Sequence, residues 1–236
     1  MSKQDKNKNL IFINSLCSCI HFSGENCSDF LNNLLISDLT AFDQNKFYYS
    51  AICNPKGRII SSLWLNKHPS GAINLICPKN MQETLLTFFN MRKFRLKIDI
   101  SVINTNIYLS SSEIVQSENE LDHESKDVIN KFYVRLFNVN FPWINKENTE
   151  KFIPQHVNLD QHDNVMSFTK GCYPGQEIIA RMKFLGRVKK RMVVIENDNK
   201  ELLMSKLDSR NQVSPIIQTN NSFSVQIIEK ITEAKV

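Results

Sequence analysis

The residue types best suited to chemistry lie together at positions 170–177, in the stretch KGCYPGQE. Its glycines and its proline predict a tight turn, and residues 176–185 predict a helix that ends at Gly186. Cys172 would then lie just ahead of a helix N-terminus, where the helix dipole and the nearby Lys170 stabilise a thiolate. The pattern therefore predicts a reactive thiol, with a buried and inert cysteine in a glycine turn as the alternative.

A run of basic residues follows this turn directly and includes one aromatic residue, Phe184. Such a run can follow the phosphates of a nucleic acid, so a tRNA or another anion is the predicted partner. The alternative is a solvated helix face whose long basic side chains cover apolar surface. The net charge of +5 adds only weak support for a nucleic-acid partner. The residues of this run are Arg181, Lys183, Arg187, Lys189, Lys190 and Arg191.

Two histidines, His156 and His162, lie near Asp160 and Asp163 and are the other residues with ligand chemistry. Their spacing matches no standard metal-ligand motif, and polar loops collect such residues by chance. We therefore predict no metal site. The sequence also lacks the GxGxxG, P-loop, HExxH and GxSxG patterns, which removes the commonest nucleotide-binding, zinc-protease and hydrolase interpretations.

The composition limits the class of protein that positions these residues. With 42% hydrophobic residues in a chain of 236, a substantial core can form, and disordered, collagen-like and coiled-coil classes are excluded. The longest apolar runs are far shorter than the roughly 20 residues of a membrane span, and no signal-peptide pattern follows the polar start. The six cysteines lack the paired spacing of a disulfide scaffold, so we expect reduced thiols in a cytoplasmic protein.

Alternation of apolar and polar residues, interrupted by Pro and Gly, predicts an α+β first part. Two turns, NPKG at 54–57 and HPSG at 68–71, join three consecutive strands that should pair in antiparallel fashion. Helical spacing and a further strand-like alternation account for the rest of this part. The predicted helices are 28–35 and 78–92, and the predicted strands are 47–52, 58–65, 72–76 and 96–103.

The second part of the chain gives weaker signals. Residues 104–130 are polar and acidic, which indicates a linker or a mobile segment. Residues 131–139 have strand character, and alternation at 191–195 and 223–228 predicts a small C-terminal β unit. The predicted division is an N-terminal α+β part at 1–103, the linker at 104–130, a second part with the KGCYPGQE motif at 131–190 and the C-terminal unit at 191–236.

Several short segments together form a longer pattern. They are FIPQ at 152–155, NL at 158–159, SF at 167–168, KGCY at 170–173, GQE at 175–177 and AR at 180–181, with AICNPKGR at 51–58 upstream. This pattern resembles the signature of the YgfZ family, folate-binding and tRNA-modifying proteins related to the aminomethyltransferase of the glycine cleavage system. The resemblance implies an α+β fold of the aminomethyltransferase type, with antiparallel sheets, a reduced middle segment and a small C-terminal unit like a β-barrel.

The resemblance also implies a function and a set of site residues. The function is binding of tetrahydrofolate or a related folate, in support of iron–sulfur enzymes that modify tRNA, with a link to the regulation of replication initiation. The family's functional cysteine falls on Cys172, and the aromatic positions against the folate fall on Cys17 and Phe132. A carboxylate of related folate proteins falls on Asn138. The remaining motif positions are Lys170, Gly171, Tyr173, Gly175, Gln176, Glu177 and Arg181.

Three functions remain open at this point. The first, which we favour, is a folate-binding accessory factor whose key thiol is Cys172. The second is a folate-dependent one-carbon transferase; against it, Ser61 and Ser62 stand where the resemblance places the catalytic carboxylates of the aminomethyltransferase. The third is a tRNA-binding module that depends on the basic run and is independent of folate.

Overall fold

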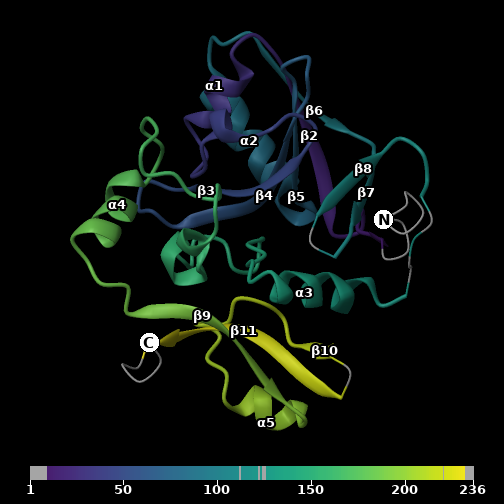
Figure 1. Cartoon of the computed structure of the whole chain (residues 1–236), viewed down its shortest axis with the longest axis vertical. Helices are drawn as coiled ribbons and strands as arrows, with labels where there is room; N and C mark the ends of the chain where they lie inside the picture. Colours follow the sequence, from purple (N-terminus) through teal and green to yellow (C-terminus); the bar gives the residue numbers. More distant parts are fainter. Residues whose placement is uncertain (1–9, 112, 122, 124–125, 220, 232–236) are drawn as a thin grey trace.

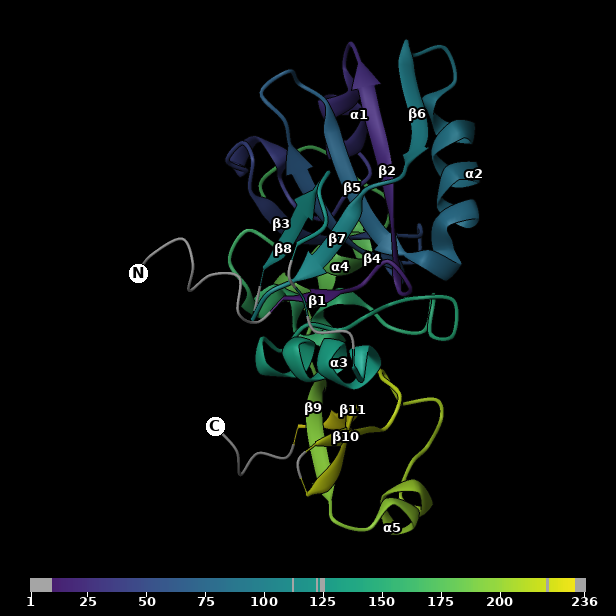
Figure 2. The same ribbon diagram turned by 90° about the vertical axis from the view of Figure 1, so that its right-hand side faces the viewer.

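The structure is a computed structural model that describes residues 10–111, 113–121, 123, 126–219 and 221–231. Within these residues the chain forms three antiparallel sheets, one of five strands and two of three. Figures 1 and 2 show the five-stranded sheet at one end, a C-terminal sheet at the other, and α3 (Val128–Asn138) between them. None of the described helices has the length and apolarity needed to cross a membrane.

The five-stranded sheet has the order β3-β4-β5-β2-β6. Its strands are β2 (Cys17–Gly24), β3 (Phe47–Cys53), β4 (Ile59–Lys67), β5 (Ile73–Pro78) and β6 (Ile98–Ile103). In the β3–β4 turn, the N–H of Gly57 donates to the carbonyl oxygen of Asn54 at 2.9 Å. In the β4–β5 turn, the N–H of Gly71 donates to the carbonyl oxygen of His68 at the same distance. The three consecutive antiparallel strands are confirmed.

Two helices pack on one face of this sheet (Figure 1). They and the neighbouring 3-10 turns are α1 (Cys27–Asn32), η1 (Leu39–Ala41), η2 (Lys79–Met81) and α2 (Gln82–Lys93). The core beneath them includes Phe22 and Phe89, whose rings meet edge to face with their centres 5.0 Å apart. A second core includes Tyr49 and Trp64 and joins the sheet to the rest of the chain. Both predicted helices are confirmed, with shifted ends.

The acidic segment 104–130 is not a simple linker, because it contains two strands and the start of α3. The strands β7 (Asn106–Leu109) and β8 (Ile114–Ser117) form a sheet with β1 (Ile11–Phe12), in the order β1-β7-β8. Tyr108, in the middle strand, is fully buried. The polar residues around these short strands obscured their alternation in the sequence.

The strand predicted at 131–139 is wrong, since most of these residues belong to helix α3. The buried side chains of the helix are Phe132, Tyr133 and Leu136, which share one helix face. Aromatic and β-branched residues favour strands, and they gave this segment its strand-like composition. Burial of one helical face overrides that preference.

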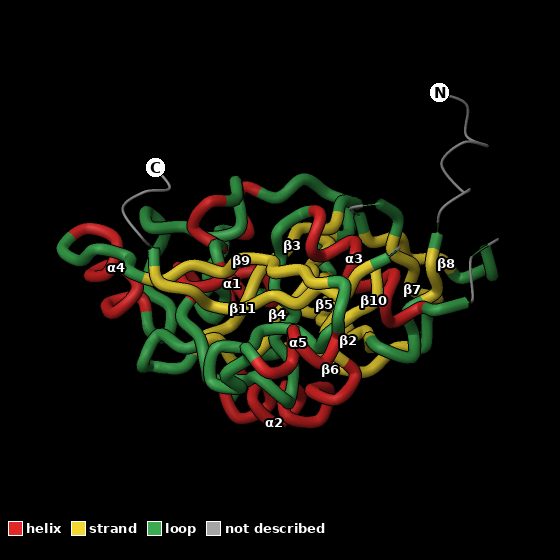
Figure 3. The backbone as a smooth tube through the Cα atoms, turned by 90° about the horizontal axis from the view of Figure 1, so that it is seen from below, coloured by secondary structure: helices red, strands yellow, loops and turns green. Residues whose placement is uncertain are grey.

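The C-terminal residues form the third sheet, in the order β10-β11-β9. Its elements are β9 (Lys190–Asn197), α5 (Lys200–Ser205), β10 (Ile217–Thr219) and β11 (Ser222–Lys230). Figure 3, seen from below, shows β9 and β11 running across the molecule in front of the five-stranded sheet. The N–H of Gln218 in β10 donates to Oδ1 of Asn130 at 3.2 Å, which ties this sheet to α3. The strands predicted at 191–195 and 223–228 are confirmed, whereas the division into four parts stays a prediction.

Candidate functional site

The KGCYPGQE segment forms a loop that leads into helix α4 (Gln176–Phe184). The helix predicted here is confirmed, and its N-cap residue is Gly175 with a φ of 82°. Cys172 is exposed, whereas each of the other five cysteines is buried. The alternative of a buried cysteine at this position is therefore wrong, whereas the reactivity of the Cys172 thiol stays a prediction.

Lys170 anchors this loop to the segment that follows α1. Its ammonium group donates to the carbonyl oxygens of Leu35 and Ser37, each at 2.6 Å, and to that of Asn32. It also lies 5.0 Å from the centre of the Tyr173 ring. Burial lowers the pKa of Lys170 to about 8. The charge that was expected to stabilise the thiolate is therefore directed at backbone carbonyls.

Gly175 packs directly against the turn between β3 and β4. A Cβ atom at this position would lie 2.5 Å from the carbonyl oxygen of Asn54 and 2.6 Å from Cα of Gly57. Both distances are far shorter than a van der Waals contact, so no side chain fits without a shift of the backbone. This close approach explains the glycine and fixes the end of the Cys172 loop against the sheet.

Two 3-10 turns that precede α4 in the sequence link α4 to the start of β9 through hydrogen bonds. They are η3 (Pro154–Val157) and η4 (Leu159–Gln161). The side-chain amide of Gln155 donates to the carbonyl oxygen of Ile179 in α4 at 2.7 Å. The guanidinium of Arg191 donates to the carbonyl oxygen of Gln155 at 2.7 Å and pairs with the carboxylate of Asp160. Arg191 therefore serves as a connection within the fold, and its charge is neutralised locally.

Most of the basic run is exposed. Arg181 donates to Glu177 one turn earlier at 2.9 Å, an exposed pair that contributes little to stability. The ammonium of Lys183 lies 3.8 Å from the centre of the Phe168 ring. Lys190, in contrast, is half-buried. The role of these residues as tRNA contacts stays a prediction; the exposed members are Arg181, Lys183, Arg187 and Lys189.

Phe132 is fully buried in an aromatic cluster. Its ring centre lies 5.2 Å from that of Trp143 and 6.5 Å from that of Trp64. Cys17 belongs to the same core, on β2 opposite Pro78, and burial raises the pKa of its thiol well above the usual value. The structure thus brings the two residues predicted to contact a folate into one core.

A cavity of about 290 Å³, which we call the ring cavity, opens beside this cluster. Its lining residues include the aromatic Phe132, Tyr133 and Trp143, of which Phe132 itself has no exposed surface, and the amide-bearing Asn80 and Asn145. Aromatic faces next to uncharged hydrogen-bonding groups suit a flat, polar heterocycle. The described residues that line this cavity do not include Cys17.

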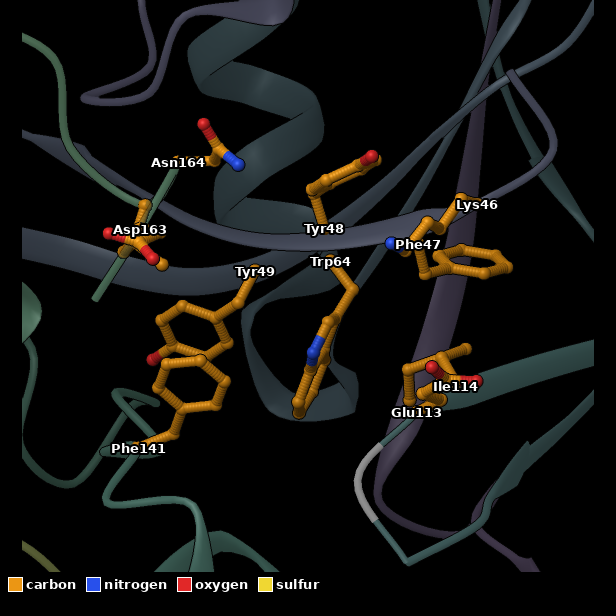
Figure 4. A pocket seen from close by; sticks show the side chains of 11 residues that line it. Lys46, Phe47, Tyr48, Tyr49, Trp64, Glu113, Ile114, Phe141, Asp163 and Asn164 are labelled. Atoms are coloured by element: carbon orange, nitrogen blue, oxygen red, sulfur yellow. The ribbon is translucent and has the colours of Figure 1, made fainter. Parts of the chain in front are cut away.

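A second cavity, of about 270 Å³, is lined by Trp64 and by the stacked rings of Tyr49 and Phe141 (Figure 4). The centres of the two stacked rings are 4.2 Å apart. Glu113 and Asp163 add carboxylates to the lining. Sequence reasoning missed this cavity because its residues come from widely separated segments. The available signal was the aromatic run that contains Tyr49.

The serine pair of β4 is part of the fold's internal hydrogen bonding. Ser61 and Ser62 are both fully buried. The Ser62 hydroxyl lies 2.5 Å from the hydroxyl of Tyr49 and accepts from the backbone N–H of Ile144 at 2.9 Å. These serines connect β4 to the segment after α3 and present no reactive group to a cavity.

The two histidines considered as metal ligands lie apart from any ligand cluster. Nε2 of His162 is 3.2 Å from the carbonyl oxygen of Asn140. Burial lowers the pKa of His156 and of His162 below the usual value. In the part of the chain that the structure describes, no three His, Cys, Asp or Glu side chains come together as a metal site would require.

Comparison with known proteins identifies relatives over most of the chain. No protein-family model matches it. A protein of Blochmanniella pennsylvanica named tRNA-modifying protein YgfZ is 29% identical over 216 aligned positions, covering 71% of this chain and 65% of the relative. A protein of the same name in Hamiltonella defensa is 22% identical, with coverage of 73% and 66%. The chain thus spans about two thirds of the length of these relatives.

A solved structure shows the same fold. It is the glycine cleavage system aminomethyltransferase T of Bartonella henselae, with a TM-score of 0.56 and 10% identity. The match covers 96% of this chain and 82% of that protein. The predicted fold class, an α+β aminomethyltransferase-like fold with antiparallel sheets, is therefore confirmed.

Proposed function

Because the chain is a homologue of the proteins named tRNA-modifying protein YgfZ, we propose that it is a folate-binding accessory protein of tRNA modification. It would act in the cytoplasm beside iron–sulfur enzymes that modify tRNA, with Cys172 as its functional thiol. Its partners would be a tetrahydrofolate-type cofactor, those enzymes and tRNA.

The observation that carries this proposal is the exposed Cys172 on a firmly held loop. Of the six cysteines in the chain, this is the one that is exposed. Lys170 ties one side of the loop to three backbone carbonyls, and Gly175 packs the other side against the β3–β4 turn. A reactive group gains from such fixed placement, because less entropy is lost when a partner approaches it.

The ring cavity is the best candidate for the folate site. Its lining residues Tyr133 and Trp143 would meet the flat face of a pterin, with the fully buried Phe132 packed against Trp143. The amides of Asn80 and Asn145 would meet the polar edge of that ring. Cys17 contributes through the packing of the core, since its side chain is almost fully buried. A reduced folate supplies one-carbon chemistry when bound; the residues around this cavity would bind and orient its ring.

Titration with tetrahydrofolate tests this assignment. We expect saturable quenching of tryptophan fluorescence, because Trp143 lines the ring cavity. Phe132→Leu should weaken binding about fivefold, since it removes the ring that packs against Trp143 while keeping an apolar side chain. The matched control is Phe89→Leu in the other core, which should bind as the wild type does. Equal affinities in the two variants, or no binding at all, would contradict the assignment.

The one-carbon transferase is disfavoured by the buried Ser61 and Ser62, which replace the expected carboxylates and are engaged in the fold. A folate-dependent turnover of formaldehyde equivalents would restore this alternative.

The folate-independent RNA-binding module rests on the exposed basic residues of α4 and its C-terminal loop. It predicts salt-sensitive tRNA binding that folate does not affect and that Lys183→Gln with Lys189→Gln removes. Such binding, combined with full function of a Cys172→Ala variant, would favour this module over the proposal.

A further inference from the structure

The loop that joins α2 to β6 lies at the end of the molecule opposite the C-terminal sheet (Figure 2). Residues 91–97, which we call the tip segment, read MRKFRLK. The side chains of Met91, Phe94 and Leu96 are 74%, 80% and 43% exposed. A single exposed apolar residue is ordinary on a protein surface, but three within six positions of one loop indicate a contact site.

Phe94 has an unusual backbone conformation. It follows the last residue of α2 with φ of 38° and ψ of −104°, a combination that aromatic residues rarely adopt. Hydrogen bonds on both sides fix the loop: the N–H of Leu96 donates to the carbonyl oxygen of Lys93 at 2.7 Å, and the Lys93 ammonium donates to that of Ile98 at 3.1 Å. Strained residues that a fold retains are concentrated at sites of contact and function. The loop therefore presents the Phe94 ring to solvent in a fixed position.

The exposed apolar side chains alternate with cations. The tip segment contains no acidic residue, and among the described residues no carboxylate forms an ion pair with any of its four basic side chains. Their charge is therefore available to an anionic partner. The four are Arg92, Lys93, Arg95 and Lys97.

We propose that the tip segment docks the protein on the surface of a membrane that contains anionic lipids. Met91, Phe94 and Leu96 would enter the headgroup region, and the basic side chains would lie against the lipid phosphates. Each Lys or Arg near an anionic leaflet adds attraction, and apolar side chains stabilise the bound state by leaving water. Such attachment is peripheral and needs no spanning helix. The inference goes beyond the proposed function and depends on neither folate nor Cys172.

The side chains of the tip segment favour a lipid surface over a nucleic acid. Met91 and Leu96 are not aromatic, so they cannot stack on a base as the platforms of RNA-binding proteins do. The guanidinium of Arg95 lies over the Phe94 ring, 5.2 Å from its centre, and so occupies one of the two faces on which a base could stack. A fluid headgroup layer can close around such side chains without a preformed pocket.

Co-sedimentation of the full chain with lipid vesicles tests the inference. The vesicles contain equal parts of phosphatidylcholine and phosphatidylglycerol, and vesicles of phosphatidylcholine alone serve for comparison. We expect binding to the anionic vesicles to be at least about tenfold tighter, and to weaken as salt is added, because exposed charges are screened.

Two variants separate the contributions of charge and apolar contact. Arg95→Gln with Lys97→Gln should weaken binding to anionic vesicles about thirtyfold, since two cations are lost. Phe94→Ser should weaken it about tenfold at low and at high salt, since apolar contact is lost. Urea unfolding confirms that these exposed substitutions leave the fold intact.

The matched controls lie on α5 and its C-cap, in the C-terminal unit. Lys200→Gln with Lys206→Gln removes the same charge from exposed positions, and Leu202→Ser removes an exposed apolar side chain. Both controls should bind as the wild type does. A second readout is Phe94→Trp, whose added tryptophan emission should shift to shorter wavelength with anionic vesicles, whereas that of Leu202→Trp should not.

Several outcomes would overturn the inference. The first is wild-type protein that stays in the supernatant with anionic vesicles at low salt. Equal weakening by the tip variants and the controls would show that net charge, rather than the tip segment, drives adsorption. Binding without an emission shift in Phe94→Trp would contradict insertion of the ring. Loss of tRNA binding in Arg95→Gln with Lys97→Gln, without any vesicle binding by the wild type, would make the tip segment an RNA contact instead.

Discussion

Two regions of this molecule contrast in their cysteines: the five-stranded sheet carries four on its strands, with Cys27 on the adjoining helix α1, and the loop ahead of α4 carries Cys172. Cys17 and Cys19 lie on β2, Cys53 ends β3 and Cys77 lies on β5, and all of them are buried. Burial raises the pKa of Cys19 to about 12 and raises the pKa of the other three as well. Cys172 is instead exposed on an anchored loop.

The difference shows that residue type alone does not indicate chemistry in this chain. A cysteine on a buried strand behaves as a small apolar side chain, and its thiol stays protonated at neutral pH. The exposed cysteine needs its own supports, which are Lys170 and Gly175. Each prediction below tests whether the two regions differ as described.

The largest expected difference is in thiol reactivity. In the native protein, Cys172 should react with a maleimide about a thousandfold faster than the sheet cysteines, because buried thiols react through rare opening of the structure. Mass spectrometry of peptides after timed labelling measures both rates, and labelling in denaturant shows that all six cysteines can react. Labelling of Cys53 or Cys77 at a rate close to that of Cys172 would remove the contrast.

Gly175→Ala should destabilise the support of the Cys172 loop most strongly. The added Cβ meets backbone atoms at 2.5 and 2.6 Å, and φ is 82°, so we expect a loss of about 3 kcal/mol in the free energy of unfolding. Gly171→Ala is the matched control, because a Cβ there meets no atom within 4 Å. Urea unfolding measures both variants, and similar losses in the two would contradict the close packing of Gly175.

Lys170→Met should have a smaller effect, a loss of about 2 kcal/mol at neutral pH. The substitution keeps an apolar stem but removes the charged donor to the carbonyl oxygens of Leu35 and Ser37. Lys206→Met, on an exposed lysine, serves as the control and should change stability little. If both variants unfold at the same urea concentration as the wild type, Lys170 does not anchor the loop.

The pH dependence of this difference tests the same contact in a second way. The pKa of Lys170 is lowered to about 8 in the folded chain, against an ordinary value of 10.5. Between these two pH values the unfolded chain binds more protons, so the contribution of this group to stability rises as the pH rises. The stability of the wild type minus that of Lys170→Met should therefore increase between pH 8 and 10. A difference that falls over this range would contradict the lowered pKa.

The sequence predicted the elements whose signals are local. The β3–β4 and β4–β5 turns carry Pro and Gly at fixed positions, and α4 has a glycine at each end. The helix α3 was misread because its composition favours a strand, and its helical face became evident through the burial of Phe132 and Leu136. Packing against the core, which no local pattern records, decides such a segment.

The sequence predicted the KGCYPGQE motif as a candidate site, but it did not predict the cavities. The exposure of Cys172 followed one of two interpretations of the KGCYPGQE turn, and the structure decided between them. The partners of Lys170 lie more than a hundred positions away in the sequence. The ring cavity likewise joins residues from Ser15 to Asn145. Contacts over such separations depend on the topology of the whole chain, so a pattern of neighbours cannot reveal them.

The central claim is that function depends on the exposed thiol, and one measurement tests it most directly. A bacterial strain that lacks its YgfZ protein is supplied with this chain, and thiolated tRNA nucleosides are quantified by mass spectrometry. We expect restoration by the wild type and by Cys27→Ala, a buried-cysteine control, but not by Cys172→Ser at equal protein level. Full restoration by Cys172→Ser would contradict the account.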